Sequence, residues 1–165
     1  MKEIPRTKAG DALTELILSM FRANNLTLAW GDRLVAPFGL TSARWQVLGA
    51  IALASRPQPV AWLARDLGVS RQNVQRIVND LRREGLVRLA PNPHHRRAHL
   101  VVLTDRGRVA YGSAVNAYSP AVDRLAEGFA PADVEAARRV LARLRDRLAA
   151  QGDADLHAEP VIAKP

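Results

Sequence analysis

The side chains best suited to chemistry form a polar run just after a glycine. From Ser70 the sequence reads Ser-Arg-Gln-Asn-Val-Gln-Arg-Ile-Val. Arg, Gln and Asn carry long donors and acceptors that match base edges and phosphates of duplex DNA. No acidic residue occurs between Asp66 and Asp80, whereas a solvated helix face usually mixes Glu with Lys. The run therefore predicts a helix that reads nucleic acid rather than a solvated structural helix.

Helical geometry sorts this segment into two faces. At about 100° per residue, the apolar residues form one stripe, made of Val74, Ile77, Val78 and Leu81. The opposite face holds Gln72, Arg76, Asn79 and Arg83, with Arg71, Asn73 and Gln75 on its flanks. The apolar stripe predicts the side that packs into the protein, and the polar face then points outward.

A shorter helix precedes this one, and the spacing between the two is that of a helix-turn-helix. Residues 60–67 form the first helix, in which the small Ala64 lets a second helix approach. Gly68 permits the left-handed turn, and Ser70 caps the helix that runs to Glu84. In such motifs the second helix enters the major groove.

The charge of the chain is concentrated around this motif. The 165 residues carry 24 Lys and Arg against 16 Asp and Glu, a net charge of +8. Between Arg56 and Arg108 there are eleven arginines and four acids, a net charge of +7. One third of the chain thus holds almost the whole positive field, which indicates a partner rich in phosphates.

The remaining segments predict a mainly α fold. We expect helices at about residues 11–35 and 42–54, a connector at 56–59, and further helices at about 105–128 and 131–150. Two β-prone runs, 86–89 and 100–103, flank a polar loop and predict a two-stranded hairpin with a basic tip. We divide the chain into an N-terminal dimerisation helix (1–40), a DNA-binding domain (41–104), C-terminal dimerisation helices (105–150) and a flexible tail (151–165).

The last helix carries an apolar stripe with the spacing of a short coiled coil. Its members are Val134, Ala137, Leu141, Leu144 and Leu148, separated by 3, 4, 3 and 4 residues. Over barely two heptads the stripe fits a helix packed on its own domain as well as it fits a dimer interface.

At this point the chain resembles the MarR-type winged helix-turn-helix regulators, from about Leu13 to Leu148. The likeness rests on the order of elements, on the helix-turn-helix followed by Leu81-Arg82-Arg83-Glu84-Gly85-Leu86-Val87, and on the wing pattern Asp-x-Arg-x5-Leu-Thr. Arg97, Leu103 and Thr104 match the wing pattern, whereas His95 stands where the family has Asp. By this resemblance Arg97 corresponds to the wing arginine that, in the family, reaches into the minor groove.

The resemblance implies a homodimeric, sequence-specific DNA-binding repressor on a palindromic operator. A small aromatic effector bound between the dimerisation and DNA-binding parts would relieve repression. The residues expected to contact DNA are Ser70, Arg71, Gln72, Asn73, Gln75 and Arg76 on the helix and Arg96 and Arg97 on the wing. Trp30, Phe38 and Trp45 are candidates for the effector pocket, although aromatic residues more often pack in cores.

Other classes of function find little support in the sequence. It has no Gly-rich phosphate loop and no nucleophile or metalloprotease motif, so we expect neither an enzyme nor a cofactor. His94, His95 and His99 cluster in the expected wing, but without cysteine or nearby carboxylates they predict solvent-facing side chains, not a metal site. The absence of cysteine and of a long apolar run fits a cytoplasmic protein. The main alternative is a winged helix that binds protein and has no DNA role.

Overall fold

The computed structural model describes residues 6–95 and 97–157, and the chain divides into two compact units. Residues up to Ala121 form the first unit and residues from Val122 onward form the second. The first unit contains α1 (Lys8–Val35), η1 (Ala36–Phe38), α2 (Ser42–Leu53), β1 (Gln58–Pro59), α3 (Val60–Leu67), α4 (Arg71–Arg83), β2 (Val87–Ala90), β3 (Leu100–Leu103) and most of α5 (Asp105–Leu125). The second contains the end of α5 and α6 (Pro131–His157). The fold is mainly helical with a small sheet, as expected.

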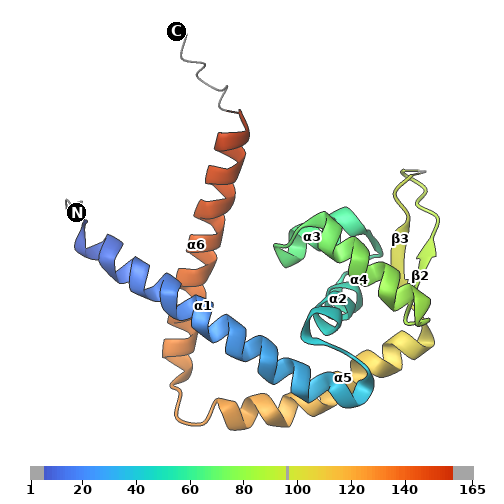
Figure 1. Cartoon of the computed structure of the whole chain (residues 1–165), viewed down its shortest axis with the longest axis horizontal. Coiled ribbons are helices and arrows are strands. Elements are labelled where there is room, and N and C mark those ends of the chain that lie inside the picture. Colours follow the sequence, from blue (N-terminus) through green and yellow to red (C-terminus); the bar gives the residue numbers. More distant parts are fainter. Residues whose placement is uncertain (1–5, 96, 158–165) are drawn as a thin grey trace. The chain divides into compact units, whose positions relative to one another are not determined.

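The core of the first unit lies between α2, α3, α4 and the hairpin of β2 and β3 (Figure 1). Its largest fully buried side chains are Leu48, Leu63, Leu81, Val35, Val47, Val74, Val78, Val87 and Val101. All nine are leucine or valine, branched aliphatic residues with few rotamers, so they fill a close-packed interior at small entropic cost. Val74, Val78 and Leu81 are the α4 members of this set, so α4 packs on the core through one face.

The junction between α1 and α2 is unusually tight. The Ser42 backbone N–H donates to Asp32 Oδ1 at 2.6 Å, and Ser42 Oγ donates to the Leu28 carbonyl at 2.9 Å. A Cβ added to Gly31 would lie 2.4 Å from Ser42 Oγ, so a larger residue at position 31 has no space. The end of α1 is thus bonded directly to the beginning of α2.

The sheet has three strands, one more than the sequence predicted. The hairpin is confirmed, with β2 and β3 antiparallel and Val87 opposite Leu103. The segment expected to be a plain connector supplies β1, which pairs with the other edge of β3 and places Gln58 opposite Val101. A two-residue strand gives no periodic signal, because its pairing depends on a partner more than forty positions away.

The base of the hairpin is bonded to the turn that follows α4. Thr104 Oγ1 lies 2.6 Å from the Gly85 carbonyl and 3.1 Å from the Leu86 carbonyl, and the Gly107 N–H donates to Thr104 Oγ1 at 3.0 Å. A Cβ on Gly107 would lie 1.9 Å from the Leu86 carbonyl oxygen. Thr104, the last residue of the wing pattern, and Gly107, three positions later, therefore fix where the wing begins relative to α4.

The second unit is dominated by α6, which continues to His157 and not to about Ala150 as predicted. The tail expected at 151–165 is therefore helical over 151–157, and 158–165 lie outside the described residues. Arg138 donates to both carboxylate oxygens of Glu135 at 2.8 Å, and this pairing holds the Glu135 pKa below its ordinary value. α5 ends at Leu125, slightly before its predicted end.

Within the described ranges, no helix combines the length and apolar character that a membrane crossing requires.

We predict that Gly107→Ala destabilises the protein by at least about 2 kcal/mol, because the new methyl group collides with backbone and not with a movable side chain. Urea unfolding measures this change. Gly112→Ala in the same helix is the control, since nothing lies within 4 Å of its Cβ. It should be neutral or stabilising, as alanine favours helix more than glycine. Equal stabilities of the two variants would contradict the assigned contact.

Candidate nucleic-acid interface

The turn between α3 and α4 forms as the sequence predicted. Gly68 ends α3 in the left-handed conformation with φ 66°, and the Val69 N–H donates to the Ala64 carbonyl at 3.1 Å. Ser70 precedes α4, and its Oγ accepts a hydrogen bond from the Asn73 N–H at 3.3 Å. These local bonds set the direction in which α4 leaves the turn.

The apolar stripe of α4 is buried, which turns the polar side outward. Val74, Val78 and Leu81 have no exposed surface, and Ile77 is 4% exposed. This burial is the largest favourable term available to a helix whose other residues are nearly all polar. The predicted division into two faces is confirmed.

The outward side chains of α4 line an open hollow of about 730 Å³. We call these residues the α4 face: Arg71, Gln72, Gln75, Arg76, Asn79, Asp80 and Arg83. Four of the predicted helix contacts belong to it. Of the other two, Ser70 is the capping residue and Asn73 is half-buried beside the face. Asn79, Asp80 and Arg83 were not among the predicted site residues, although helical spacing already placed Asn79 and Arg83 on this side.

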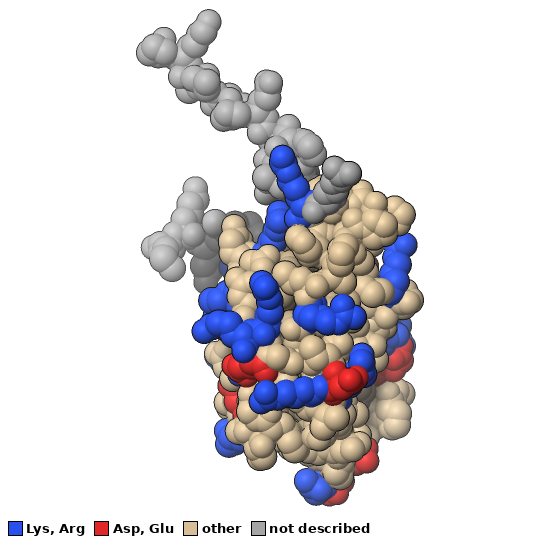
Figure 2. Space-filling model, turned by 90° about the vertical axis from the view of Figure 1, so that its right-hand side faces the viewer, with Lys and Arg blue, Asp and Glu red and all other residues tan. Residues whose placement is uncertain are grey.

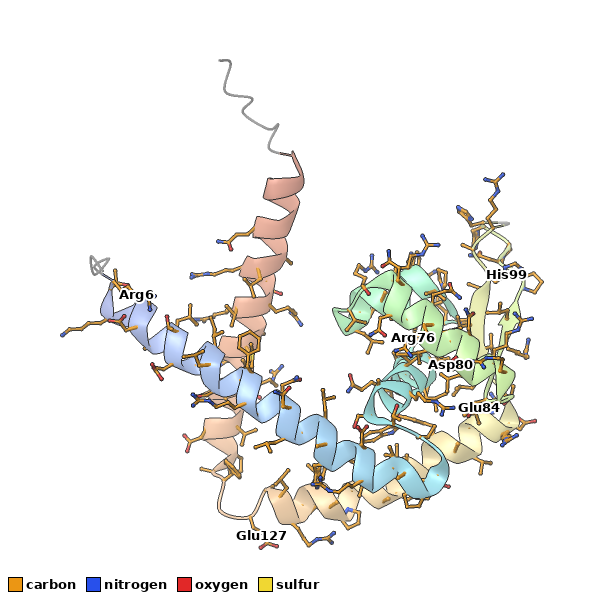
Figure 3. The ribbon with its side chains drawn as sticks, viewed as in Figure 1. Arg6, Arg76, Asp80, Glu84, His99 and Glu127 are labelled. Carbon is orange, nitrogen blue, oxygen red and sulfur yellow. The ribbon has the colours of Figure 1, made fainter. Side chains whose placement is uncertain are left out.

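The α4 face is connected by hydrogen bonds and ion pairs within itself. Arg76 Nη2 donates to Asn73 Oδ1 at 3.1 Å, and Arg76 Nη1 lies 3.9 Å from Asp80 Oδ2. The other oxygen of Asp80 pairs with Arg83. Figure 3 shows Arg76 and Asp80 following one another along α4. The guanidinium groups are thus held in place before any ligand arrives.

The C-terminal end of α4 is joined to α2 by an ion pair. Glu84 caps α4, and its carboxylate accepts from Arg44 Nη2. Arg44 Nη1 also donates to the Gly39 carbonyl at 3.1 Å, and its side chain is only 18% exposed. No local pattern in the sequence indicates this pair, because its members are forty positions apart. Arg44 thus joins the C-terminal end of α4 to α2, next to the residues Gly85 and Leu86 that the wing junction holds.

The wing, defined as β2, β3 and the loop between them, presents basic side chains to solvent. Arg97 is exposed, and the predicted contact Arg96 lies outside the described residues. Asn92 organises the loop: its Nδ2 donates to the Ala98 carbonyl at 2.9 Å, and its Oδ1 accepts from the His94 N–H at 3.0 Å. The loop therefore has a polar anchor of its own although His95 replaces the family carboxylate.

Lys and Arg side chains spread over the wing side of the molecule, and the acids on it lie among them (Figure 2). The wing histidines His94, His95 and His99 are exposed. In the described part of the chain, no three His, Cys, Asp or Glu side chains are grouped to hold a metal ion.

The three aromatic pocket candidates have different surroundings. Trp30 and Trp45 both contact Tyr118, with ring centroids 5.8 and 5.1 Å away, whereas Phe38 packs against the core. A largely apolar hollow of about 500 Å³ lies between α2, β1, α3 and α5 and is lined by Trp45 together with Tyr111, but by neither Trp30 nor Phe38. The sequence reasoning missed Tyr111 and Tyr118, which come from the start and middle of α5.

Comparison with known proteins assigns the chain to one group of regulators. A sequence profile of the MarR family matches residues 38–98. An uncharacterised protein of Mycobacterium tuberculosis is 37% identical over 135 residues, covering 82% of this chain and 93% of that protein. The transcriptional activatory protein BadR of Rhodopseudomonas palustris is 36% identical over 116 residues, 65% of each chain.

A solved structure extends this likeness to a DNA complex. The transcriptional repressor CouR, bound to a 23-mer DNA duplex, superimposes with a TM-score of 0.71. It is 27% identical in sequence, and the match covers 86% of this chain and 99% of CouR. These likenesses favour a DNA-binding regulator over the protein-binding alternative and over an enzyme.

The Arg44–Glu84 pair yields a prediction about the free protein. In a double-mutant cycle with Arg44→Met and Glu84→Gln, we expect a coupling energy of about 0.5–1.5 kcal/mol, because the Arg44 side chain is mostly buried. Urea unfolding of the four proteins gives this value. The exposed pair Arg138 and Glu135 is the control and should couple more weakly. Additive effects of the two substitutions would mean that the ion pair does not stabilise the end of α4.

Proposed function

Because the chain belongs to the MarR family of DNA-binding transcription regulators, we propose that it is a homodimeric repressor of a palindromic operator. The observation that carries this proposal is the α4 face, whose polar residues are turned outward by a fully buried apolar stripe. In this proposal residues 41–104 bind DNA, and residues 1–40 and 105–150 join the two protomers.

The α4 residues take the base-reading role in this proposal. Ser70, Arg71, Gln72, Asn73, Gln75 and Arg76 face the major groove. Arg76 is suited to the O6 and N7 acceptors of guanine, because a guanidinium donates two parallel hydrogen bonds. The helix N-terminus, with its free N–H groups, favours a nearby phosphate. Arg96 and Arg97 on the wing contact the flanking minor groove or the backbone.

Exposed apolar residues outside the DNA-binding part support a dimer. In α1, Phe21 is 60% exposed and Leu26 is 73% exposed. In α6, the stripe members Val134, Leu141 and Leu148 are also exposed. Large apolar side chains gathered on exposed helix faces mark sites of protein association. We assign both helices to the dimer interface. In this proposal the α6 stripe contacts the second protomer and does not pack on its own domain.

A small aromatic effector completes the proposal. The hollow lined by Trp45 and Tyr111 has the apolar character of a small-molecule site and lies next to α3. Trp30 and Phe38 stay candidates for a pocket that extends beyond this hollow. When an effector releases a repressor from DNA, the repressed gene is expressed. The relative BadR, in contrast, is described as an activatory protein. A reporter gene behind the selected operator distinguishes repression from activation.

Selection of bound duplexes from a random pool tests the function. We expect enrichment of a palindrome whose half-sites lie about one helical turn apart, or a multiple of it. No enrichment would contradict the proposal and favour the protein-binding alternative.

Two arginine substitutions should have different effects on the selected duplex. Arg76→Ala should cost about 1–3 kcal/mol and relax the preference at one position, because it removes a base contact. Arg97→Ala should weaken binding to all sequences and reduce the salt slope by about one, because it removes a phosphate contact. Fluorescence anisotropy at several salt concentrations measures both. Arg124→Ala, at the end of α5, is the control for net charge and should change neither quantity.

Leu141→Asp should weaken the dimer at least about tenfold, because the dimer would bury an unpaired charge. Sedimentation velocity at several protein concentrations measures this. Leu53→Asp changes a leucine of α2 that is 80% exposed, against 40% for Leu141, and it should leave the dimer intact. If Leu141→Asp sediments like the native chain, α6 is not in the interface.

A further inference from the structure

Asp80 is an acidic side chain within a surface that is otherwise basic and neutral. The α4 face contains the three arginines 71, 76 and 83 together with this one acid. The Asp80 side chain is 30% exposed, against 70% for Arg76 and 77% for Arg83. It therefore lies deeper on the face than the two arginines, while still bordering the hollow.

The two oxygens of this carboxylate have different partners. Oδ1 pairs with Arg83, and Oδ2 lies 3.9 Å from Arg76 Nη1. Arg76 is also bonded to Asn73 through its other terminal nitrogen, so its guanidinium is held between an amide and a carboxylate. Figure 3 shows Arg76 and Asp80 on the same side of α4. In the free protein, two arginines of the interface thus already have an anionic partner.

A DNA phosphate competes with this carboxylate for the same donors. An arginine that turns from Asp80 to a phosphate leaves the carboxylate partly exposed near a polyanion, where like charges repel. A guanine edge offers neutral acceptors, so an arginine can bind it without abandoning the carboxylate. A carboxylate can also accept from the N4 amino group of cytosine. Asp80 therefore disfavours contacts to phosphates alone and permits contacts to particular bases.

We propose that Asp80 is a specificity-determining residue, which weakens the binding of arbitrary duplex by competing with phosphates for Arg76 and Arg83. This inference rests on the proposed function, because it presumes that the α4 face lies against DNA. Specificity is a difference between affinities, and an element that penalises wrong partners raises it as effectively as a new attractive contact.

A merely structural role for Asp80 makes a different prediction. Pairs at spacings of three and four residues on an exposed helix stabilise it slightly. If that were the whole role of Asp80, removing its charge would shift the unfolding transition and leave the ratio between cognate and non-cognate affinities unchanged. The ratio of affinities is therefore the decisive measurement.

The test compares Asp80→Asn with Asp66→Asn in the full-length protein. Both variants remove one acidic charge and keep the shape of the side chain. Asp66, on α3, pairs with Arg65 outside the α4 face. Fluorescence anisotropy measures the affinity of each protein for the duplex selected from the random pool and for a scrambled duplex of the same length, between 50 and 200 mM salt. Unfolding curves establish that all three proteins are folded at the temperature of the assay.

We expect Asp80→Asn to bind the scrambled duplex about threefold to tenfold more tightly at low salt, with a salt slope larger by about one to two, because one or two arginines become free for phosphates. Its affinity for the selected duplex should rise less or fall, so that the ratio of the two affinities drops at least about threefold. Asp66→Asn should keep the ratio of the native chain.

An unchanged ratio for Asp80→Asn, or an equal loss of ratio in both variants, would overturn the role of Asp80. A native chain that does not distinguish the selected from the scrambled duplex would overturn the proposed function itself. The two failures are therefore distinguishable.

Discussion

The burial of four aliphatic side chains on one side of α4 determines most of what this protein presents to its surroundings. Val74, Ile77, Val78 and Leu81 have almost no exposed surface, so the helix cannot rotate about its axis without bringing apolar groups into water. Packing consequently turns the polar side of α4 outward, and the hydrogen bond and ion pairs within the α4 face hold its side chains there. The direction in which the α4 face points is therefore a consequence of the core.

Two long-range contacts then fix where this helix ends. Arg44 holds Glu84 from α2, and Thr104 bonds to the carbonyls of Gly85 and Leu86 from the base of the wing. Aliphatic contacts are not directional, whereas hydrogen bonds are. The polar contacts at the C-terminal end of α4 therefore add directional bonds to α2 and to the base of the wing.

How much of this structure the sequence predicts depends on how far apart in the sequence the interacting residues lie. The stripe of α4, the Gly68 turn and the Ser70 cap follow from neighbours within one or two helical turns, and each was predicted correctly. β1 was missed, because two residues carry no period and their pairing with β3 spans the whole helix-turn-helix. Asp80 was visible in the sequence, yet a count of charges does not reveal that it pairs with two arginines.

The absence of a side chain at Gly31 allows α1 and α2 to be joined directly. Ser42, at the first turn of α2, is bonded both to a carboxylate and to a carbonyl of α1. The 28 residues of α1 are thus anchored near their C-terminal end to the beginning of α2. A larger side chain at position 31 would displace Ser42 Oγ and break its hydrogen bond to the Leu28 carbonyl.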